Sequence, residues 1–306
     1  MKDSPYFKQA ELMLKTIPHV TAETCFALKG GTAINLFVRD MPRLSVDIDL
    51  AYLPVDEPRD TALNKMSAAL GRIAGAIKKS IAGAKVQETR AQHPDRITKL
   101  TVSVGPTRIK IEPNEVIRGA VFPAEERELT PSAEEMFELS VTAQTLSLAD
   151  LYGGKLCAAL DRQHPRDLFD VKLLLQNEGI TDEIRKAFVV YLASHDRPMH
   201  ELLDPKRKDV RRIYEIEFAG MPIEEIAYED LIGARETVIE TLKKELTDDE
   251  KTFLLSIKSG EPNWRVMGIK GLEKLPALQW KLTNIRKISA KKRTELLDKL
   301  KRTLGL

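Results

Sequence analysis

The sequence predicts an α+β protein in which a mixed half of helices and strands precedes a helical half. Period-two alternation of apolar and polar residues, which is typical of strands, falls within the first 120 residues. Beyond Ser147 the pattern becomes almost wholly helical. Residues 122–135 contain two prolines and many glutamates, which indicates a connector or a short irregular strand region. We therefore expect the boundary between residues 120 and 145.

Short helices and strands alternate in the first half. A helix is expected from the Ser4-Pro5 cap to about Ile17, and an Ala-rich helix over residues 57–83. Gly30-Gly31 is expected to separate a strand from a short helix over Thr32–Val38, and Gly105-Pro106 to turn the chain between two strands. The expected strands are Phe26–Leu28, Ser45–Ala51, Lys85–Thr89, Ile97–Val104 and Thr107–Glu112.

The second half contains a succession of helices. Ser147 is expected to cap a helix that runs through Leu160, and Pro165 to open another that ends near Gln176. Further helices are expected near residues 182–194, 207–218, 223–246, 248–258 and 290–303. We expect two domains, an αβ core over residues 1–140 and a helical domain over residues 141–306.

Composition and charge are those of a globular protein. The 306 residues are 42% hydrophobic and carry a net charge of +2, so there is no general bias toward nucleic acid. Positive charge is concentrated in Lys281–Leu306, which has nine Lys and Arg against two acidic residues, a net charge of +7. This stretch could hold an RNA backbone through phosphate contacts, or it could be a solvated last helix.

Cysteine usage and hydropathy indicate a cytoplasmic protein. Cys25 and Cys157 both stand in apolar surroundings, which excludes a disulfide scaffold and fits a reducing cytosol. The five histidines form no zinc motif with them. No run of 18 apolar residues exists, so we expect no membrane span, and Met1–Pro5 lacks an apolar signal region.

The sequence Gly30-Gly31-Thr32 has the properties of a phosphate-binding turn. Two glycines between a strand and a helix allow backbone amides to approach a phosphate, and the helix N-terminus adds positive potential. The Thr32 hydroxyl could donate a hydrogen bond to a phosphate oxygen. The alternative is an ordinary strand–helix turn, and no Walker motif occurs in the chain.

Asp47 and Asp49 alternate with aliphatic residues on an expected strand. Residues i and i+2 of a strand share a face and lie about 6–7 Å apart, so the two carboxylates repel each other unless a cation lies between them. Arg43 and Ser45 precede them, and Arg43 could neutralise phosphate charge. The alternative is a solvated strand face.

Glu112 lies on an expected strand in which Ile109 and Ile111 face the opposite side. If this strand lies beside the strand of Asp47, Glu112 can join the metal site as a third carboxylate. The alternative is an exposed edge strand with alternating charge.

Lys155 follows two adjacent glycines inside an expected helix. Each glycine costs about 1 kcal/mol relative to alanine, which a helix tolerates when something packs closely against it. The alternative is a lysine that extends from a surface helix into solvent. In the next helix, Asp170 is spaced to interact with Asp167 and Arg166, although acidic residues in a first turn are also ordinary partners of the helix dipole.

The order of these motifs resembles the AbiEii/AbiGii toxin family, a branch of the DNA polymerase β-type nucleotidyltransferase superfamily. The resemblance covers about residues 24–176 and extends more faintly to Leu275–Leu282. It implies a polymerase β-like core with a mixed sheet, followed by a helical C-terminal domain that completes the active-site cleft. The motifs are Lys29-Gly30-Gly31-Thr32, Arg43-x-Ser45-x-Asp47-x-Asp49-Leu50, Lys110-x-Glu112, Lys155-Leu156 and Arg166-Asp167-Leu168-x-Asp170.

The resemblance implies a toxin of a bacterial toxin–antitoxin module, of the abortive-infection type. Such a toxin would use Mg²⁺, or Mn²⁺, to transfer a nucleoside monophosphate from an NTP to an acceptor hydroxyl, with the tRNA 3′ end as the expected acceptor. Its partner would be a separately encoded antitoxin with a winged-helix DNA-binding domain.

The resemblance also assigns roles to individual residues. Asp47, Asp49 and Lys155 would be catalytic with Asp170 in support, and Lys155 would also contact phosphate. Asp47 and Asp49 would ligate Mg²⁺, with Glu112 as the third carboxylate. The remaining nucleotide-binding residues would be Gly30, Gly31, Thr32, Arg43 and Ser45.

Three alternatives remain open at this stage. The acceptor could be a protein or a small molecule, as in antibiotic-modifying members of the superfamily. The chain could be a catalytically silent nucleotide-binding module that acts through contacts with a partner, although its carboxylates argue against this. It could also be an RNA-binding protein that uses only its basic C-terminal stretch.

Overall fold

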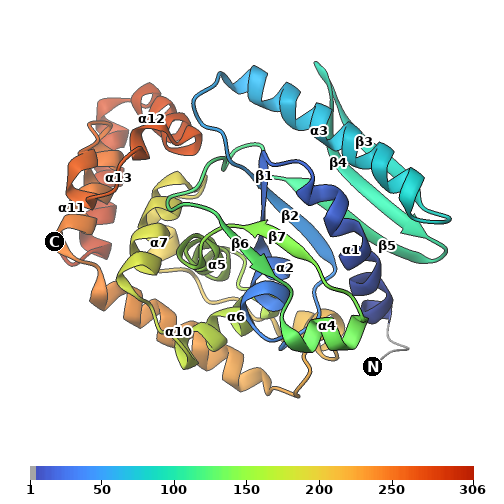
Figure 1. Ribbon diagram of the computed structural model, residues 1–306. Helices are drawn as coiled ribbons and strands as arrows, with labels where there is room; N and C mark the ends of the chain where they lie inside the picture. The colour runs from blue at the N-terminus through green and yellow to red at the C-terminus, as the bar shows by residue number, and fades with distance from the viewer. Residues whose placement is uncertain (1–4) are drawn as a thin grey trace. The chain divides into compact units, whose positions relative to one another are not determined.

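The computed structural model describes residues 5–306, so the expected cap at Ser4 lies outside the described residues. The chain divides into two compact units. Unit 1 is Met1–Ser147 with Gly220–Glu225, and unit 2 is Leu148–Ala219 with Ile226–Leu306. Unit 1 contains a mixed β-sheet with helices and unit 2 is helical, which confirms the predicted α+β class (Figure 1).

The sheet of unit 1 has seven strands. They are β1 (Phe26–Lys29), β2 (Asp47–Tyr52), β3 (Lys85–Gln92), β4 (Asp95–Val104), β5 (Thr107–Pro113), β6 (Glu125–Glu128) and β7 (Thr142–Thr145). Their order across the sheet is β3-β4-β5-β2-β1-β7-β6. The strand β2 therefore lies in the interior, antiparallel to β1 and parallel to β5.

Two helices cover one face of the sheet. The helix α1 (Pro5–Thr21) packs against β5 and β7, and α3 (Arg59–Ser80) packs against β4 (Figure 1). Ala10, Met13, Leu14 and Ile17 are fully buried at the helical spacing of an amphipathic helix. This face of the sheet is thus the hydrophobic core of unit 1.

A sharp turn connects β1 to the helix that follows it. Gly30 has φ +70°, a left-handed conformation that glycine adopts without steric cost. The chain then forms the short helix α2 (Gly30–Ala33), which continues without interruption as the π-helical segment η1 (Ile34–Val38). Later in unit 1, α4 (Pro131–Phe137) begins with proline in its first turn.

Several helices of unit 2 begin with conventional caps. Thr181, Thr247 and Ser289 accept hydrogen bonds from first-turn amides, and Pro165 opens α6. No helix in residues 5–306 is both long and apolar enough to cross a membrane. The helices are α5 (Leu148–Asp161), α6 (Pro165–Gln176), α7 (Asp182–Ser194), α8 (Met199–Leu203), α9 (Arg211–Ile213), η2 (Tyr214–Phe218), α10 (Tyr228–Glu245), α11 (Asp248–Ser259), η3 (Trp264–Met267), η4 (Leu272–Lys274), α12 (Pro276–Lys287) and α13 (Ala290–Thr303).

The segment Gly220–Glu225 returns from unit 2 to unit 1. The Met221 carbonyl accepts a hydrogen bond from the Leu44 amide at 3.0 Å, and the Ile223 amide donates to the Pro42 carbonyl at 2.9 Å. These bonds make a short antiparallel bridge. The loop before β2 is therefore held by a segment that lies far away in the sequence.

Most predicted elements are present, and the differences are local. The helices predicted over residues 182–194 and 290–303 have the predicted bounds. The helix predicted near residues 207–218 begins later, at Arg211, and consists of the short α9 followed directly by the π-helical η2. The strand β7 and the helices α8 and α12 were not predicted.

Only one of the two glycines in α5 is required for packing. A Cβ at Gly153 would lie 2.7 Å from the Phe188 amide nitrogen and 2.8 Å from two atoms of Ala187, so α7 approaches α5 closely there. A Cβ at Gly154 would meet nothing within 4 Å.

We expect Gly153→Ala and Gly154→Ala to have opposite effects on stability. The first forces α5 and α7 apart and should lower the free energy of unfolding by about 1–3 kcal/mol. The second removes a glycine from an open helical position and should raise it by up to about 1 kcal/mol. Urea denaturation measures both, and equal effects would contradict the assignment of the close contact to Gly153.

Candidate active site

The glycine turn lies directly against the two groups that follow it in the predicted motif. A Cβ at Gly30 would lie 2.6 Å from the Asp49 Oδ2 atom, and a Cβ at Gly31 would lie 2.7 Å from the Arg43 Nη2 atom. Lys29 also pairs with Asp49 in the register of β1 and β2. The turn thus combines a carboxylate, a guanidinium and the positive end of a helix within a small volume.

Thr32 connects the turn to the beginning of β2. Its hydroxyl is buried, donates to the Asp47 carbonyl and lies 2.9 Å from the Ser45 hydroxyl. These bonds fix Ser45 and the backbone of Asp47 relative to α2. A contact from the Thr32 hydroxyl to phosphate stays a prediction, since the hydroxyl already has partners within the protein.

Arg43 is held in a fixed position next to the glycine turn. The side chain is only 2% exposed, and its Nη1 atom donates to the Leu44 carbonyl at 3.0 Å. The bridge to Pro222 holds the backbone of the same residue. A contact from this buried guanidinium to a bound anion stays a prediction.

Asp47, Asp49 and Glu112 lie on one face of two adjacent strands. In the parallel pairing of β2 and β5, Asp47 is opposite Lys110 and Asp49 is opposite Glu112, so the condition for Glu112 to lie near the two aspartates is met. The Glu112 carboxylate, however, forms an ion pair with Lys99 at 3.1 Å. In residues 5–306, no three His, Cys, Asp or Glu side chains are grouped closely enough to hold a metal ion.

The donor set nevertheless fits a magnesium ion that is shared with a substrate. Protein-bound Mg²⁺ is often held by one or two carboxylates together with phosphate oxygens and waters, rather than by a complete protein cage. Asp47 and Asp49 meet that requirement, and the Asp49 carboxylate faces the glycine turn. The role of Glu112 as a third ligand stays a prediction, because it requires the ion pair with Lys99 to open.

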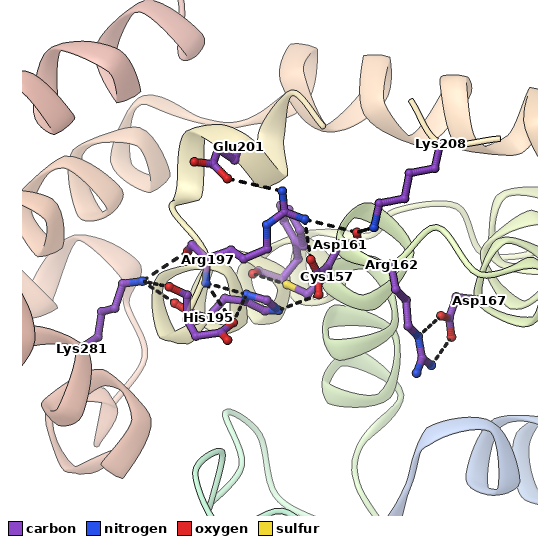
Figure 2. A network of polar contacts seen from close by, with 11 residues as sticks. Cys157, Asp161, Arg162, Asp167, His195, Arg197, Glu201, Lys208 and Lys281 are labelled. Carbon is purple, nitrogen blue, oxygen red and sulfur yellow. Dashed lines mark hydrogen bonds and ion pairs between the residues drawn. The ribbon is translucent and has the colours of Figure 1, made fainter. Parts of the chain in front are cut away.

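A second group of charged residues lies inside unit 2. The Lys155 ammonium on α5 forms ion pairs with Asp167 at 3.0 Å and Asp170 at 2.9 Å, both on α6. Arg162 also donates to Asp167 (Figure 2). Lys155 is 6% exposed and both aspartates are 0% exposed, so this is a desolvated network rather than a surface pair.

The electrostatics of the network are visible at Asp167. Burial alone would raise the pKa of its carboxyl, but the positive charges of Lys155 and Arg162 outweigh burial and hold the pKa well below its usual range. Asp167 is therefore ionised at neutral pH and fixes the position of Lys155.

Asp167 and Arg162 were not among the predicted site residues. An aspartate in the first turn of a helix is ordinarily interpreted as a partner of the helix dipole, and Arg162 belongs to none of the motifs. Arg162 directly follows the last residue of α5, and its contact with Asp167 depends on the packing of α5 against α6, so the spacing along one helix contained no signal for it.

Comparison with known proteins shows the family and the fold of the chain. The chain matches the family described as "Nucleotidyl transferase AbiEii toxin, Type IV TA system" over residues 12–284. Among solved structures it is similar to MenT4, a nucleotidyltransferase toxin from Mycobacterium tuberculosis H37Rv, with a TM-score of 0.62 and 13% identity. That similarity covers 98% of this chain and 93% of the MenT4 chain, and at this identity it shows the fold alone. No curated protein matches the chain.

We expect Lys155→Met to destabilise unit 2 strongly. The substitution leaves two buried carboxylates without their shared counter-ion, which should cost about 3–5 kcal/mol. Lys172→Met is the matched control, because Lys172 pairs at 3.8 Å with Asp230, which is 53% exposed, and should cost less than about 0.5 kcal/mol. Urea denaturation compares the two, and a cost below about 1 kcal/mol for Lys155→Met would contradict a buried network.

The same network predicts a loss of stability in acid. Because the pKa of Asp167 is lower in the folded than in the unfolded state, its contribution is complete above the unfolded value of about 4 and is lost as the pH falls below it. The free energy of unfolding, measured from pH 6 to pH 3, should therefore decrease. Asp167→Asn should show a shallower decrease, and an identical slope would assign the acid sensitivity to other groups.

Proposed function

The chain belongs to the AbiEii family of nucleotidyltransferase toxins of type IV toxin–antitoxin systems, and on this basis we propose that it transfers a nucleoside monophosphate from an NTP to an RNA hydroxyl. The acceptor in this proposal is the 3′ end of tRNA. The reaction depends on Mg²⁺, or Mn²⁺, and takes place in the cytoplasm. One observation carries the proposal: the Asp49 carboxylate, which shares a strand face with Asp47, lies against a helix start at Gly30-Gly31 that the buried Arg43 adjoins.

The glycine turn would bind the triphosphate. The missing side chains of Gly30 and Gly31 bring Asp49 and Arg43 against the turn, and in this proposal the backbone amides at the helix start bind the phosphate. Arg43 adds a fixed positive charge next to Gly31. Ser45, which Thr32 holds in place, supplies a hydroxyl at the edge of the same turn.

Asp47 and Asp49 would hold the metal and handle the proton. When bound, Mg²⁺ would offset charge on the triphosphate oxygens. One of the two carboxylates would accept the proton of the acceptor hydroxyl as that oxygen attacks the α-phosphate in line. A new P–O bond then forms to the acceptor, and the bond between the α- and β-phosphates breaks to release pyrophosphate.

Lys155 and Asp170, which belong to unit 2, are the remaining residues to which we assign a catalytic role. In this proposal the buried carboxylates Asp167 and Asp170 orient the Lys155 ammonium, which would offset charge on the phosphates during transfer. A direct contact with phosphate requires Lys155 to leave one of its two partners.

The partners of the proposed reaction follow from the family and from charge. The type IV toxin–antitoxin family implies a cognate antitoxin; a winged-helix DNA-binding domain in that antitoxin is part of our proposal. The net charge of +7 over residues 281–306 supports an RNA acceptor, since it provides sequence-independent contacts to phosphates.

Loss of one carboxylate tests the proposal. The protein is incubated with α-labelled NTPs, Mg²⁺ and total tRNA, and the label is followed on a denaturing gel. We expect Asp47→Ala to lower RNA labelling at least about 100-fold, because the substitution removes a metal ligand and a proton acceptor. The matched control is Asp95→Ala, an exposed aspartate in unit 1 that pairs with Arg90 and should leave labelling unchanged.

RNA labelling and growth assays together decide among the alternatives. Equal labelling by the wild type and Asp47→Ala would remove Asp47 from the chemistry. Label that migrates with protein or with a small molecule would identify a different acceptor. Growth arrest that survives Asp47→Ala combined with Asp49→Ala would indicate a catalytically silent nucleotide-binding module. Full toxicity after truncation at Gln279 would exclude a protein that acts only through its basic C-terminal stretch.

The metal role of Glu112 has its own test. If Glu112 is the third ligand, Glu112→Gln should raise the Mg²⁺ concentration for half-maximal activity, because a neutral amide binds the cation more weakly. Glu88→Gln, a change of the same type at a residue paired with Arg90, serves as the control. An unchanged Mg²⁺ titration would restrict the metal site to Asp47 and Asp49.

A further inference from the structure

One side of α12 is fixed firmly to its surroundings. Ala277, Leu278, Leu282 and Ile285 are buried. The Lys281 ammonium donates to the carbonyl of His195, and it lies 3.4 Å and 3.3 Å from the carbonyls of Asp196 and Arg197 at the end of α7 (Figure 2). The rotation of α12 about its own axis is therefore determined, and so is the direction of its remaining side chains.

The opposite side of α12 presents a large aromatic ring to solvent. Trp280 is 55% exposed, and the other exposed large hydrophobic side chains of the described residues, Val116, Ile216, Ile223 and Leu306, are all aliphatic. Asn284 and Lys287 follow Trp280 at i+4 and i+7, so the three residues share one exposed helix face. Trp280 and Lys287 are about 10 Å apart along that face.

The surroundings of Trp280 are strongly positive. Residues 276–293 contain six Lys and Arg and no Asp or Glu. Lys287, Lys291 and Lys292 are exposed, the last with Glu295 at 3.4 Å as a solvent-exposed partner. An exposed ring within a stretch of net positive charge combines the two components that bind single-stranded nucleic acid, namely a stacking surface and contacts to phosphates.

The neighbours of Trp280 favour nucleic acid over a protein partner. A tryptophan at the centre of a protein interface is enclosed by apolar residues that exclude water. Around Trp280 the exposed residues are instead polar, namely Gln279, Thr283 and Asn284. A base that stacks on the ring needs no such apolar border.

We propose that Trp280 is a stacking platform for an unpaired nucleotide of the RNA acceptor, with Lys287 and the basic residues after it in contact with the adjacent phosphates. This inference rests on the proposed function, since it concerns the RNA that the enzyme would modify. It assigns part of RNA binding to the outer face of α12.

Tryptophan fluorescence tests the platform directly. The chain has two tryptophans, Trp264 and Trp280, so Trp264→Phe leaves Trp280 as the sole reporter. Trp264 packs against Phe253, and phenylalanine preserves an aromatic ring there. We expect a single-stranded oligouridylate of 12 nucleotides, at about 50 mM salt, to quench the emission saturably, and a perfect RNA duplex of the same length to quench it much less.

Affinity measurements with matched variants give the second readout. In fluorescence anisotropy with a dye-labelled oligouridylate, Trp280→Ala should weaken binding about 5- to 150-fold, and Trp280→Phe should weaken it less. Lys287→Ala should reduce the slope of log affinity against log salt by about one. Trp264→Phe should bind like the wild type.

All binding measurements are made without NTP in the Asp47→Ala background, so they do not depend on catalysis. Unchanged Trp280 emission on addition of RNA, or equal affinity of Trp280→Ala and the parent protein, overturns the platform. A change in emission with the antitoxin but not with RNA also overturns it, and assigns the face to a protein. Normal binding at Trp280 with no transfer to RNA by the active enzyme would instead overturn the proposed function alone.

Discussion

The candidate site depends on the close approach of backbone to charged side chains at Gly30-Gly31. The carboxylate of Asp49 and the guanidinium of Arg43 occupy the space in which side chains of these two residues would begin. The left-handed φ of Gly30 gives a second reason why a side chain is excluded there. Since the turn also begins α2, one local constraint fixes the carboxylates, the arginine and a helix N-terminus relative to one another.

The two groups of charged residues differ in their energetic character. On β2, Asp47 and Asp49 share a strand face and are partly exposed. In unit 2, Asp167 and Asp170 have their counter-ion in Lys155, and burial makes that pairing obligatory. The first group is therefore open to solvent, whereas the second is desolvated and internally balanced. A catalytic contribution from Lys155 would have to be larger than the cost of separating it from a buried partner.

The sequence predicted the fold wherever local signals were strong. Pro165, Thr181 and Ser289 mark helix starts by capping and by fixed φ, and these helices have nearly the predicted bounds. The strand β7 was missed because four residues carry no clear periodicity, and its place is set by pairing with Leu28.

The same distinction applies to the candidate site. The shared face of Asp47 and Asp49 follows from the period of a strand, whereas the approach of the Asp49 carboxylate to Gly30 depends on the pairing of β1 with β2. The contact of Asp167 with Lys155, and the bridge from Met221 to Leu44, depend on tertiary packing between distant segments, which spacing along one element does not reveal.

The bridge also has a practical meaning for protein engineering. A gene fragment that stops at Ser147 would encode every strand of the sheet, yet it would lack Gly220–Glu225 and leave Pro42–Leu44 without that support. The αβ core is therefore discontinuous in the chain, and a minimal version would have to graft those six residues back.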